Sequence, residues 1–398
     1  MPQSSARGMA MPFSPIRKLV PLANKAKAKG IKVFHLNIGQ PDIATPTIAL
    51  DAIRNIDRKI LEYSPSEGIL SFREKLVGYY QKYNIEVSAG EIIVTTGGSE
   101  AITFAFIACL NPGDEVIVPD PAYANYITFA ISAGVVVKSI PSRIEEGFAL
   151  PPVEEFEKFI TPLTKGILIC NPNNPTGHLY SKEELLKIRD IVKKHDLFLF
   201  SDEVYREFCY TDDPYISAFH LEGIEQNVVL LDSVSKRYSE CGIRIGMLVT
   251  RNREVYQNVL KLCQARLSPP LLGQIVAEAS LDVDKEYMSS IYQEYIQRRD
   301  FLIEGLNRIP GVFSPTPMGA FYTVARLPVE NADHFCEWLL SDFQLDGQTL
   351  FIAPASGFYS TPGCGANEAR IAYVLNREDL AVCLKILEEA LRVYPGVK

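Results

Sequence analysis

The sequence lacks the patterns of several common functional classes. Its 398 residues carry 40 Lys and Arg against 48 Asp and Glu, a formal net charge of −8, and no dense basic run. A nucleic-acid-binding protein would need a basic face, so this class is disfavoured. No apolar stretch reaches the ~18 residues that a membrane helix requires. The longest stretch, Ala101–Leu110, has the length of a core helix and predicts no membrane span.

Signatures of metal sites and disulfides are also missing. None of the eight cysteines stands at Cys-x-x-Cys spacing, and the five histidines never pair at metal-ligand spacing. Most cysteines lie in apolar runs, which is typical of buried free thiols in a reducing compartment. We therefore expect no metal site and a cytoplasmic location.

The first thirty residues are basic but lack the apolar centre of a secretory signal. A transit peptide is one interpretation, and a structured arm is the one we favour. The prolines at positions 12, 15 and 21 favour an extended segment before a helix.

Nucleotide and hydrolase motifs are absent as well. No Gly-x-Gly-x-x-Gly follows a strand, and there is no P-loop and no Gly-x-Ser-x-Gly elbow. A dinucleotide-binding fold therefore has little support.

What the sequence does contain is an alternation of helices with short apolar strands. Strands are expected at Ile92–Thr95, Glu115–Val118, Val135–Lys138, Gly166–Cys170, Leu197–Ser201, Val228–Leu231 and Gly246–Thr250. Helices are expected at Ala44–Glu62 with Thr45 as its cap, Gly68–Tyr83, Ser99–Leu110, Tyr126–Ala133, and from Ser181, with a capping box to Glu184, to about His195. Fully apolar strands predict a parallel sheet covered on both faces.

The fold class is therefore α/β, with two parts. Residues 46–285 are expected to form a large doubly wound domain. Beyond them, the long amphipathic stretches Tyr287–Asn307 and Ala332–Phe343 flank short strands such as Ala320–Ala325. We expect residues 286–398 to form a smaller α+β domain together with an N-terminal arm, residues 1–45.

Candidate chemical groups gather at the predicted strand ends, where ligands bind in open α/β sheets. Lys236 follows a buried strand, so its amine pKa is expected to fall and make it a Schiff-base nucleophile. Arg244, between two glycines, suits bidentate phosphate binding, and Ser233 offers a hydroxyl. Taken singly, a surface lysine and a structural arginine would explain these residues.

Other strand ends carry complementary groups. Asp202 ends a buried strand and needs a partner, which a protonated pyridine nitrogen would supply, and Tyr205 could donate to an oxygen of the same ring. Asn174 sits in a proline-fixed turn. The turn 97–99 opens a helix and forms an anion seat, and Tyr123 offers a ring for stacking.

Together these motifs resemble the class I and II aminotransferases of pyridoxal-phosphate fold type I. The matched motifs run from Leu36 to Tyr373, so the resemblance covers nearly the whole chain. Its most specific motifs are Ser235-Lys236-x5-Gly242-x-Arg244-x-Gly246, and Asn174-Pro175-Thr176-Gly177 followed by Ser201-Asp202-Glu203-Val204-Tyr205. The resemblance implies a large, mostly parallel sheet domain, a smaller domain, and pyridoxal 5'-phosphate as cofactor.

The resemblance also implies roles for individual residues. Lys236 would carry the cofactor and move a proton, and Asp202 would keep the pyridine nitrogen protonated. Asn174 and Tyr205 would contact the phenolic oxygen, and Tyr123 would stack on the ring. The phosphate would be held by Gly98, Ser99, Ser233 and Arg244.

Three further positions concern the substrate and the partner subunit. Arg370 would grip the substrate α-carboxylate, with Gly39 in the loop beside it. Tyr63 matches a tyrosine that reaches the neighbouring subunit's phosphate, which implies a homodimer with shared active sites. Glu240 departs from the small residue usual in the family, and we expect it to point away from the phosphate.

The expected activity is ping-pong transfer of an amino group from an L-amino acid to a 2-oxo acid such as 2-oxoglutarate, in amino acid metabolism and biosynthesis. Aspartate is the first choice of donor, with Arg266 or Arg17 as candidate cations for a distal carboxylate. Aromatic, alanine-type or methionine substrates are alternatives, as is a carbon–sulfur β-lyase. A regulator built on this fold would need a DNA-binding domain before the resemblance begins, near Ser14.

Overall fold

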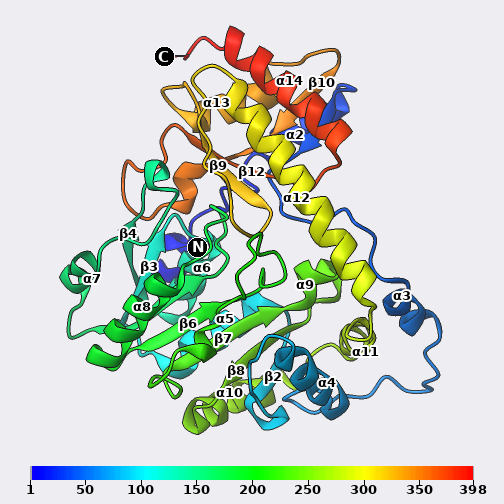
Figure 1. Ribbon diagram of the computed structural model, residues 1–398, viewed down its shortest axis with the longest axis vertical. Helices are drawn as coiled ribbons and strands as arrows, with labels where there is room; N and C mark the ends of the chain where they lie inside the picture. Colours follow the sequence, from blue (N-terminus) through cyan, green and yellow to red (C-terminus); the bar gives the residue numbers. More distant parts are fainter. Residues whose placement is uncertain (1, 398) are drawn as a thin grey trace.

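A seven-stranded sheet is the centre of the large unit in the computed structural model, which describes residues 2–397 (Figure 1). Its strand order is β2-β8-β7-β6-β5-β3-β4. The strands are β2 (Ile92–Thr95), β3 (Glu115–Asp120), β4 (Val136–Pro141), β5 (Thr164–Cys170), β6 (Phe198–Asp202), β7 (Val228–Ser233) and β8 (Gly246–Thr250). Neighbouring strands are parallel except at β8, which runs antiparallel to both β2 and β7. The α/β class and the mostly parallel sheet are therefore confirmed.

Helices cover both faces of this sheet because its strands are apolar on both sides. One face packs against α5 (Gly98–Cys109), α6 (Asn125–Ala133) and α10 (Arg253–Arg266). The other face packs against α4 (Leu70–Gln81), α7 (Val153–Phe159), α8 (Lys182–His195) and α11 (Leu271–Ser280). In β6, Phe200 points to the first layer and Leu199 to the second, as the two-residue period of a strand requires.

The smaller unit combines both ends of the chain (Figure 1). Its strands β9 (Tyr322–Arg326), β11 (Ala353–Pro354) and β12 (Glu368–Ala372) form an antiparallel sheet, and β1 (Lys32–His35) pairs in parallel with β10 (Gln348–Phe351). Its helices are α2 (Val20–Ala28), α13 (Ala332–Ser341) and α14 (Arg377–Val393). The long helix α12 (Lys285–Arg308) extends from it towards α11 and α3 (Thr47–Arg54).

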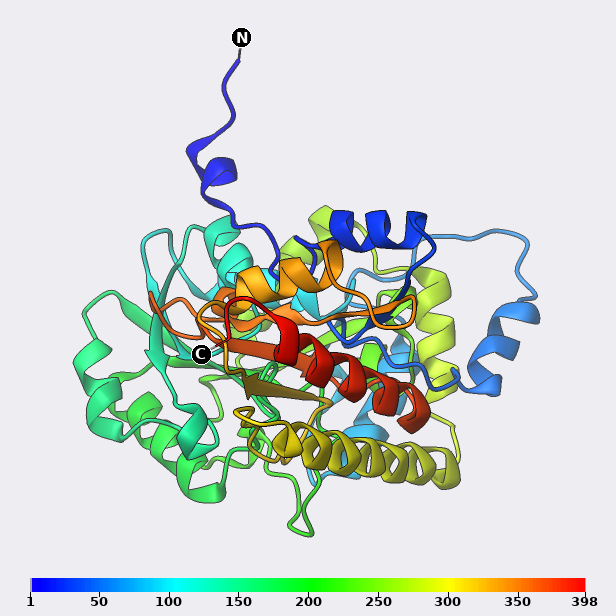
Figure 2. The ribbon, with the colours of Figure 1, turned by 90° about the horizontal axis from the view of Figure 1, so that it is seen from above.

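The N-terminal residues take two forms. The short helix α1 (Ala6–Ala10) and the residues before it project from the body, whereas α2 lies on the small unit (Figure 2).

The remaining elements are the 3-10 turns η1 (Ala89–Glu91), η2 (Ile144–Glu146), η3 (Ala218–His220), η4 (Cys241–Ile243) and η5 (Ala355–Phe358). The boundaries at residues 46 and 285 stay a prediction.

Two expected elements differ from the structure. β8 was expected to be parallel, but the short link from β7 holds α9 (Val234–Arg237) and η4, and no crossover helix. A parallel connection needs a longer crossover, so the chain turns back. The helix expected over 44–62 is α3 alone, which ends at Arg54, and Thr45 donates its hydroxyl hydrogen bond to Ser239 O instead of capping it.

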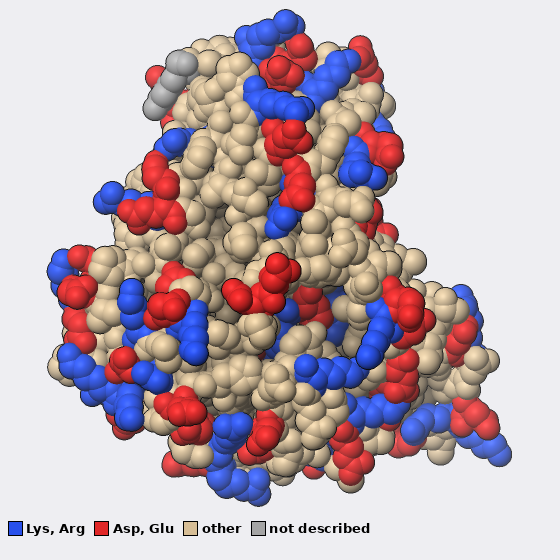
Figure 3. Space-filling model, viewed as in Figure 1, with Lys and Arg blue, Asp and Glu red and all other residues tan. Residues whose placement is uncertain are grey.

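Several local expectations are confirmed. Ser181 and Glu184 form the capping box of α8, and Pro21 lies in the first turn of α2. The extended segment expected before α2 was wrong at Pro15, because residues 15–19 form turns in which the amides of Arg17 and Lys18 donate to Ser14 O. Within residues 2–397, no helix is both long and apolar enough to cross a membrane. Acidic and basic side chains are interspersed over the face drawn in Figure 3, in keeping with the modest net charge.

Candidate active site

A cavity of about 460 Å³ lies at the carboxyl ends of β5, β6 and β7, between the large sheet and the small unit. It is the place where an open α/β sheet binds its ligands. Eleven of the twelve predicted site residues line it: Gly39, Gly98, Ser99, Tyr123, Asn174, Asp202, Tyr205, Ser233, Lys236, Arg244 and Arg370. Residues far apart in the sequence are therefore brought together here.

Lys236 reaches this cavity from α9. The hydroxyl of Ser233 caps the helix by accepting a hydrogen bond from the amide of Ser235 (3.1 Å). The amine of Lys236 donates to Gly39 O at 2.8 Å and lies 3.8 Å from the sulfur of Cys241. The link between β7 and β8 thus holds the lysine against the small unit.

The pKa of the Lys236 amine differs from expectation. Burial lowers it, but the neighbouring Tyr322, Cys241 and Tyr123 raise it, and the net pKa lies above the ordinary 10.5. The expectation of a lowered pKa was wrong because it counted desolvation alone. The placement of the amine, rather than a lowered pKa, is what sets Lys236 apart.

Asp202 ends β6 as a buried acid. Its Oδ2 accepts a hydrogen bond from the Tyr126 hydroxyl at 2.6 Å, and Oδ1 accepts a weaker one from the Val204 amide. Burial raises the pKa of Asp202 to about 6, against the lowering effect of both hydrogen bonds. Asp202 forms no ion pair with any residue in the described range 2–397, so the carboxylate is available for a cationic ligand group.

A chain of hydrogen bonds joins the two sides of the cavity. The Asn174 amide nitrogen donates to the Tyr205 hydroxyl (3.3 Å), which is 3.0 Å from the Tyr322 hydroxyl. The other end of the Asn174 side chain accepts from Arg370 at 3.0 Å. The turn after β5 is thereby connected to β9 and β12 of the small unit.

Arg370 is a buried arginine that has no acidic partner among residues 2–397. It is 1% exposed, its guanidinium lies 4.7 Å from the ring centres of Tyr322 and Phe358, and a second hydrogen bond goes to Asn37 O. Burial lowers its pKa from 12.5, and Nε has no hydrogen-bond partner among the described residues. A buried guanidinium in this state is suited to binding a carboxylate.

The start of α5 forms a second anion seat. Gly97 has φ +76°, and α5 begins at Gly98 with its amides directed to the cavity mouth. A Cβ at Gly97 would lie 2.3 Å from Nη2 of Arg244, so glycine allows the guanidinium to approach the turn. The Ser233 hydroxyl donates to Ile245 O (2.8 Å), which also fixes β7 to the strand that follows Arg244.

Not every predicted residue lies at the cavity. Tyr63 is 76% exposed, in the segment between α3 and α4. Arg266 points elsewhere, to Glu100 (3.1 Å) and to Ser66 O. Arg17 does line the cavity, and Glu240 turns away from it, as expected, to accept a hydrogen bond from Ser280 of α11.

Several residues that line the cavity were not predicted from the sequence. Tyr126 and Tyr322 hold Asp202 and Tyr205, and Cys241 lies beside Lys236. Tyr126 lies three residues after Tyr123, at the start of α6, and this nearness in the sequence is a signal that could have identified it. Tyr322 and Cys241 carried no comparable signal.

Comparisons with known proteins identify the family of this chain. The profile described as "Aminotransferase class I and II" matches residues 31–387. An aspartate aminotransferase of Thermotoga maritima is 33% identical over 386 residues, covering 95% of this chain and 97% of that protein. A crystal structure of an aspartate aminotransferase from Thermotoga maritima is 30% identical and has a TM-score of 0.88, covering 98% of this chain and 100% of that chain. An aromatic-amino-acid aminotransferase of Thermococcus litoralis is 30% identical (95% and 96% coverage), and the structure of an alanine aminotransferase from Pyrococcus furiosus has 30% identity and a TM-score of 0.89 (97% and 99% coverage).

Proposed function

The chain belongs to the class I and II aminotransferases, which use pyridoxal 5'-phosphate, and from this premise we propose that it transfers the amino group of L-aspartate to a 2-oxo acid such as 2-oxoglutarate. Transaminase activity follows from the family. The donor and acceptor are the proposal, and the named activity of the Thermotoga maritima relative supports aspartate.

The side chains around the cavity fit the cofactor. The 97–98 turn and Arg244 offer amide and guanidinium donors to a phosphate. Asp202, without a cationic partner in the described chain, offers a carboxylate to a protonated ring nitrogen. Lys236 and the ring of Tyr123 border the same cavity.

The observation that carries the substrate class is the buried guanidinium of Arg370. An uncompensated buried charge is costly, and an amino acid or 2-oxo acid brings a carboxylate that would offset this cost. Arg370 is oriented by Asn174 and by Asn37 O, so its free Nε is held in a fixed direction.

The roles of the residues follow from these positions. When bound, pyridoxal 5'-phosphate supplies an aldehyde that takes up the amino group and an electron-poor ring that accepts charge from the α-carbon. Lys236 Nζ removes the proton from the α-carbon of the donor and later returns one to the product. Asp202 holds the proton on the ring nitrogen, and Tyr205 with Asn174 donates towards the ring oxygen.

Assembly and location belong to the same proposal. A homodimer with shared sites is supported by exposed apolar side chains on and after α3, including Ile53, Ile60 and Leu61. A cytoplasmic location is supported by the eight cysteines, all free in the structure.

The test is an absorbance spectrum of purified protein with pyridoxal 5'-phosphate, recorded before and after L-aspartate is added. A visible band that moves to the near ultraviolet is expected, and L-alanine and L-phenylalanine serve as comparison donors. A band that responds to those donors and not to aspartate would overturn the choice of donor. Release of pyruvate and ammonia from cystathionine would instead identify a β-lyase. Lys236→Ala is the control that should lack the visible band.

A further inference from the structure

Arg17 lies at the edge of the active-site cavity on a segment held by its neighbours. The carbonyl of Ile16 accepts a hydrogen bond from the side chain of Asn37 (2.9 Å), a residue with 0% exposure. On the other side, Lys18 forms an ion pair with Asp333 of α13. The residues before and after Arg17 are thus tied to the small unit, while its own side chain is exposed at the cavity.

The charges around the cavity leave one arginine without a function. Among the described residues, the cations that line it are Arg17, Lys236, Arg244 and Arg370. The proposed function uses the lysine for the cofactor and proton, Arg244 for the phosphate, and Arg370 for the α-carboxylate. Arg17 forms no ion pair or side-chain hydrogen bond within residues 2–397.

The competing cation is already neutralised. Arg266 pairs with Glu100, and its two terminal nitrogen atoms donate to the Thr96 hydroxyl and to Ser66 O, while its Nε has no partner among the described residues. It does not line the cavity in this chain. Recruiting it to a substrate would require breaking a half-buried ion pair, whereas Arg17 needs no such exchange.

Arg17 and Arg370 are also connected through one residue. Asn37 accepts a hydrogen bond from Arg370 with its backbone carbonyl and donates one to Ile16 O with its side chain. A buried residue therefore holds the backbone beside Arg17 close to Arg370, while the Arg17 side chain stays free to reach a ligand. Two arginines that border one cavity are suited to a ligand with a carboxylate at each end.

We propose that Arg17 is the specificity-determining residue that binds the distal carboxylate of four- and five-carbon dicarboxylic substrates. The inference rests on the proposed function, since it takes Arg370 to bind the α-carboxylate. It makes the N-terminal arm part of the substrate site, with selectivity for aspartate, glutamate and their 2-oxo acids over neutral side chains.

The experiment compares Arg17→Gln with the wild type in single-turnover half-reactions with L-aspartate and L-alanine. Loss of a charged hydrogen-bonding partner is expected to lower kcat/KM for aspartate about 10- to 100-fold, mainly by raising KM. The kcat/KM for alanine should stay within about threefold of the wild-type value. Arg17→Lys should recover part of the aspartate activity. Lys29→Gln removes an exposed charge from the same arm and should leave kcat/KM unchanged for both substrates.

A second measurement separates the two proposals. Inhibition of the alanine reaction by maleate, an unreactive dicarboxylate, is compared with inhibition by butyrate. Arg17→Gln should weaken the inhibition by maleate and leave the inhibition by butyrate unchanged. If wild-type protein rejects aspartate but binds maleate through Arg17, the proposed donor fails and the inference stands. The inference would be overturned if Arg17→Gln lowered kcat/KM equally for aspartate and alanine. It would also be overturned if the variant changed neither kcat/KM for aspartate nor the inhibition constant of maleate.

Discussion

Glu240 is a buried acid whose proton should make folding depend on pH. It is 2% exposed, and one of its oxygens has no partner among the described residues. Burial raises its pKa from 4.5 to about 7, although the Ser280 hydroxyl and Arg237 lower it. Because the folded-state pKa is above the unfolded one, the folded chain keeps the proton between these values. The contribution of Glu240 to stability is therefore largest below about pH 4.5, and it declines as the pH rises to about 7.

Glu240→Gln, which cannot ionise, should remove this decline. Relative to the variant, the wild type is expected to lose about 3 kcal/mol of unfolding free energy between pH 5 and pH 8. Calorimetry would register this as a change of roughly 3–4 °C in the gap between the two Tm values. The matched control is Glu286→Gln on the exposed side of α12. A gap that stays constant with pH would contradict the assignment of a raised pKa to Glu240.

Single residues of the site were predictable where a strand end or a motif marked them. Lys236, Asp202 and Asn174 each follow an apolar strand, so the sequence placed them at one sheet edge, and the structure brings them to one cavity. The contacts of Tyr322 and Asn37 were not predictable, because they join residues 117 and 21 positions apart in the sequence. The pKa of Lys236 was mispredicted for a similar reason, since Tyr123, Cys241 and Tyr322 come from three separate segments.

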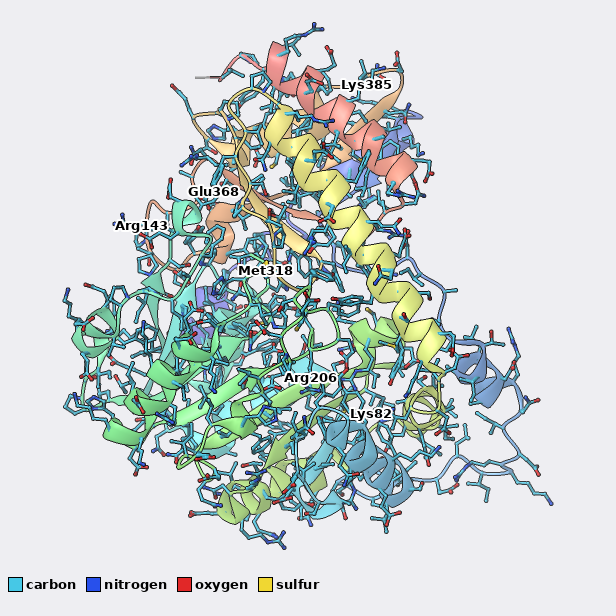
Figure 4. All side chains as sticks on the ribbon, in the orientation of Figure 1. Lys82, Arg143, Arg206, Met318, Glu368 and Lys385 are labelled. Atoms are coloured by element: carbon cyan, nitrogen blue, oxygen red, sulfur yellow. The ribbon has the colours of Figure 1, made fainter. Side chains whose placement is uncertain are left out.

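At the scale of elements, a buried network of charges supports the helix that carries Lys236. Arg237, 0% exposed, pairs with Asp232 of β7 at 2.7 Å and with Glu207 at 3.0 Å. Arg206, also 0% exposed, shares Asp232 and lies in the interior of the large unit, close to α4 (Figure 4). The short helix α9 is therefore tied to the end of β7 by its last residue.

Arg237→Met should destabilise the fold strongly, because it leaves Asp232 and Glu207 with less compensation in a dry core. Breaking a buried pair in this way costs about 3–5 kcal/mol, which thermal unfolding would detect. The variant should also hold pyridoxal 5'-phosphate less tightly in equilibrium dialysis, since α9 positions Lys236. Arg54→Met removes an exposed pair with Asp51 and should cost less than about 1 kcal/mol. Equal effects at the two sites would show that the network does not hold α9.

The bounds of an element were predictable where an apolar run or a capping box marked them in the sequence. The strands β2, β5 and β6 and the capped helix α8 appear close to their expected bounds. The reversal of β8 was missed because a buried antiparallel strand is as apolar as a parallel one. The pairing of β1 with β10 was also beyond the sequence, since its register depends on partners over 300 residues apart.

At the scale of the whole molecule, the surface after α3 exposes large apolar side chains. The segment that follows α3 runs along the outside of the large unit (Figure 1). Its side chains Ile60, Leu61 and Tyr63 are 73%, 61% and 76% exposed. Large apolar side chains exposed together are typical of an interface, so we expect a homodimer in which this segment is covered.

Hybrid dimers test whether Tyr63 acts in the partner's site. Lys236→Ala and Tyr63→Ala are each expected to be nearly inactive at limiting pyridoxal 5'-phosphate. If Tyr63 serves the other subunit, a mixed dimer has one site with both substitutions and one with neither. Co-refolding the two inactive variants should then restore activity to about a quarter of the wild type, since about half of the dimers formed by random pairing are mixed and each holds one intact site. If Tyr63 serves its own subunit, both sites of the mixed dimer are defective and no activity returns.

Replacing Tyr63→Ala by Asp202→Ala gives the control, because both substitutions then lie in residues that line the cavity of a single chain and the mixture should stay inactive. Recovery in the first mixture and not in the second would establish that each active site needs two copies of this chain.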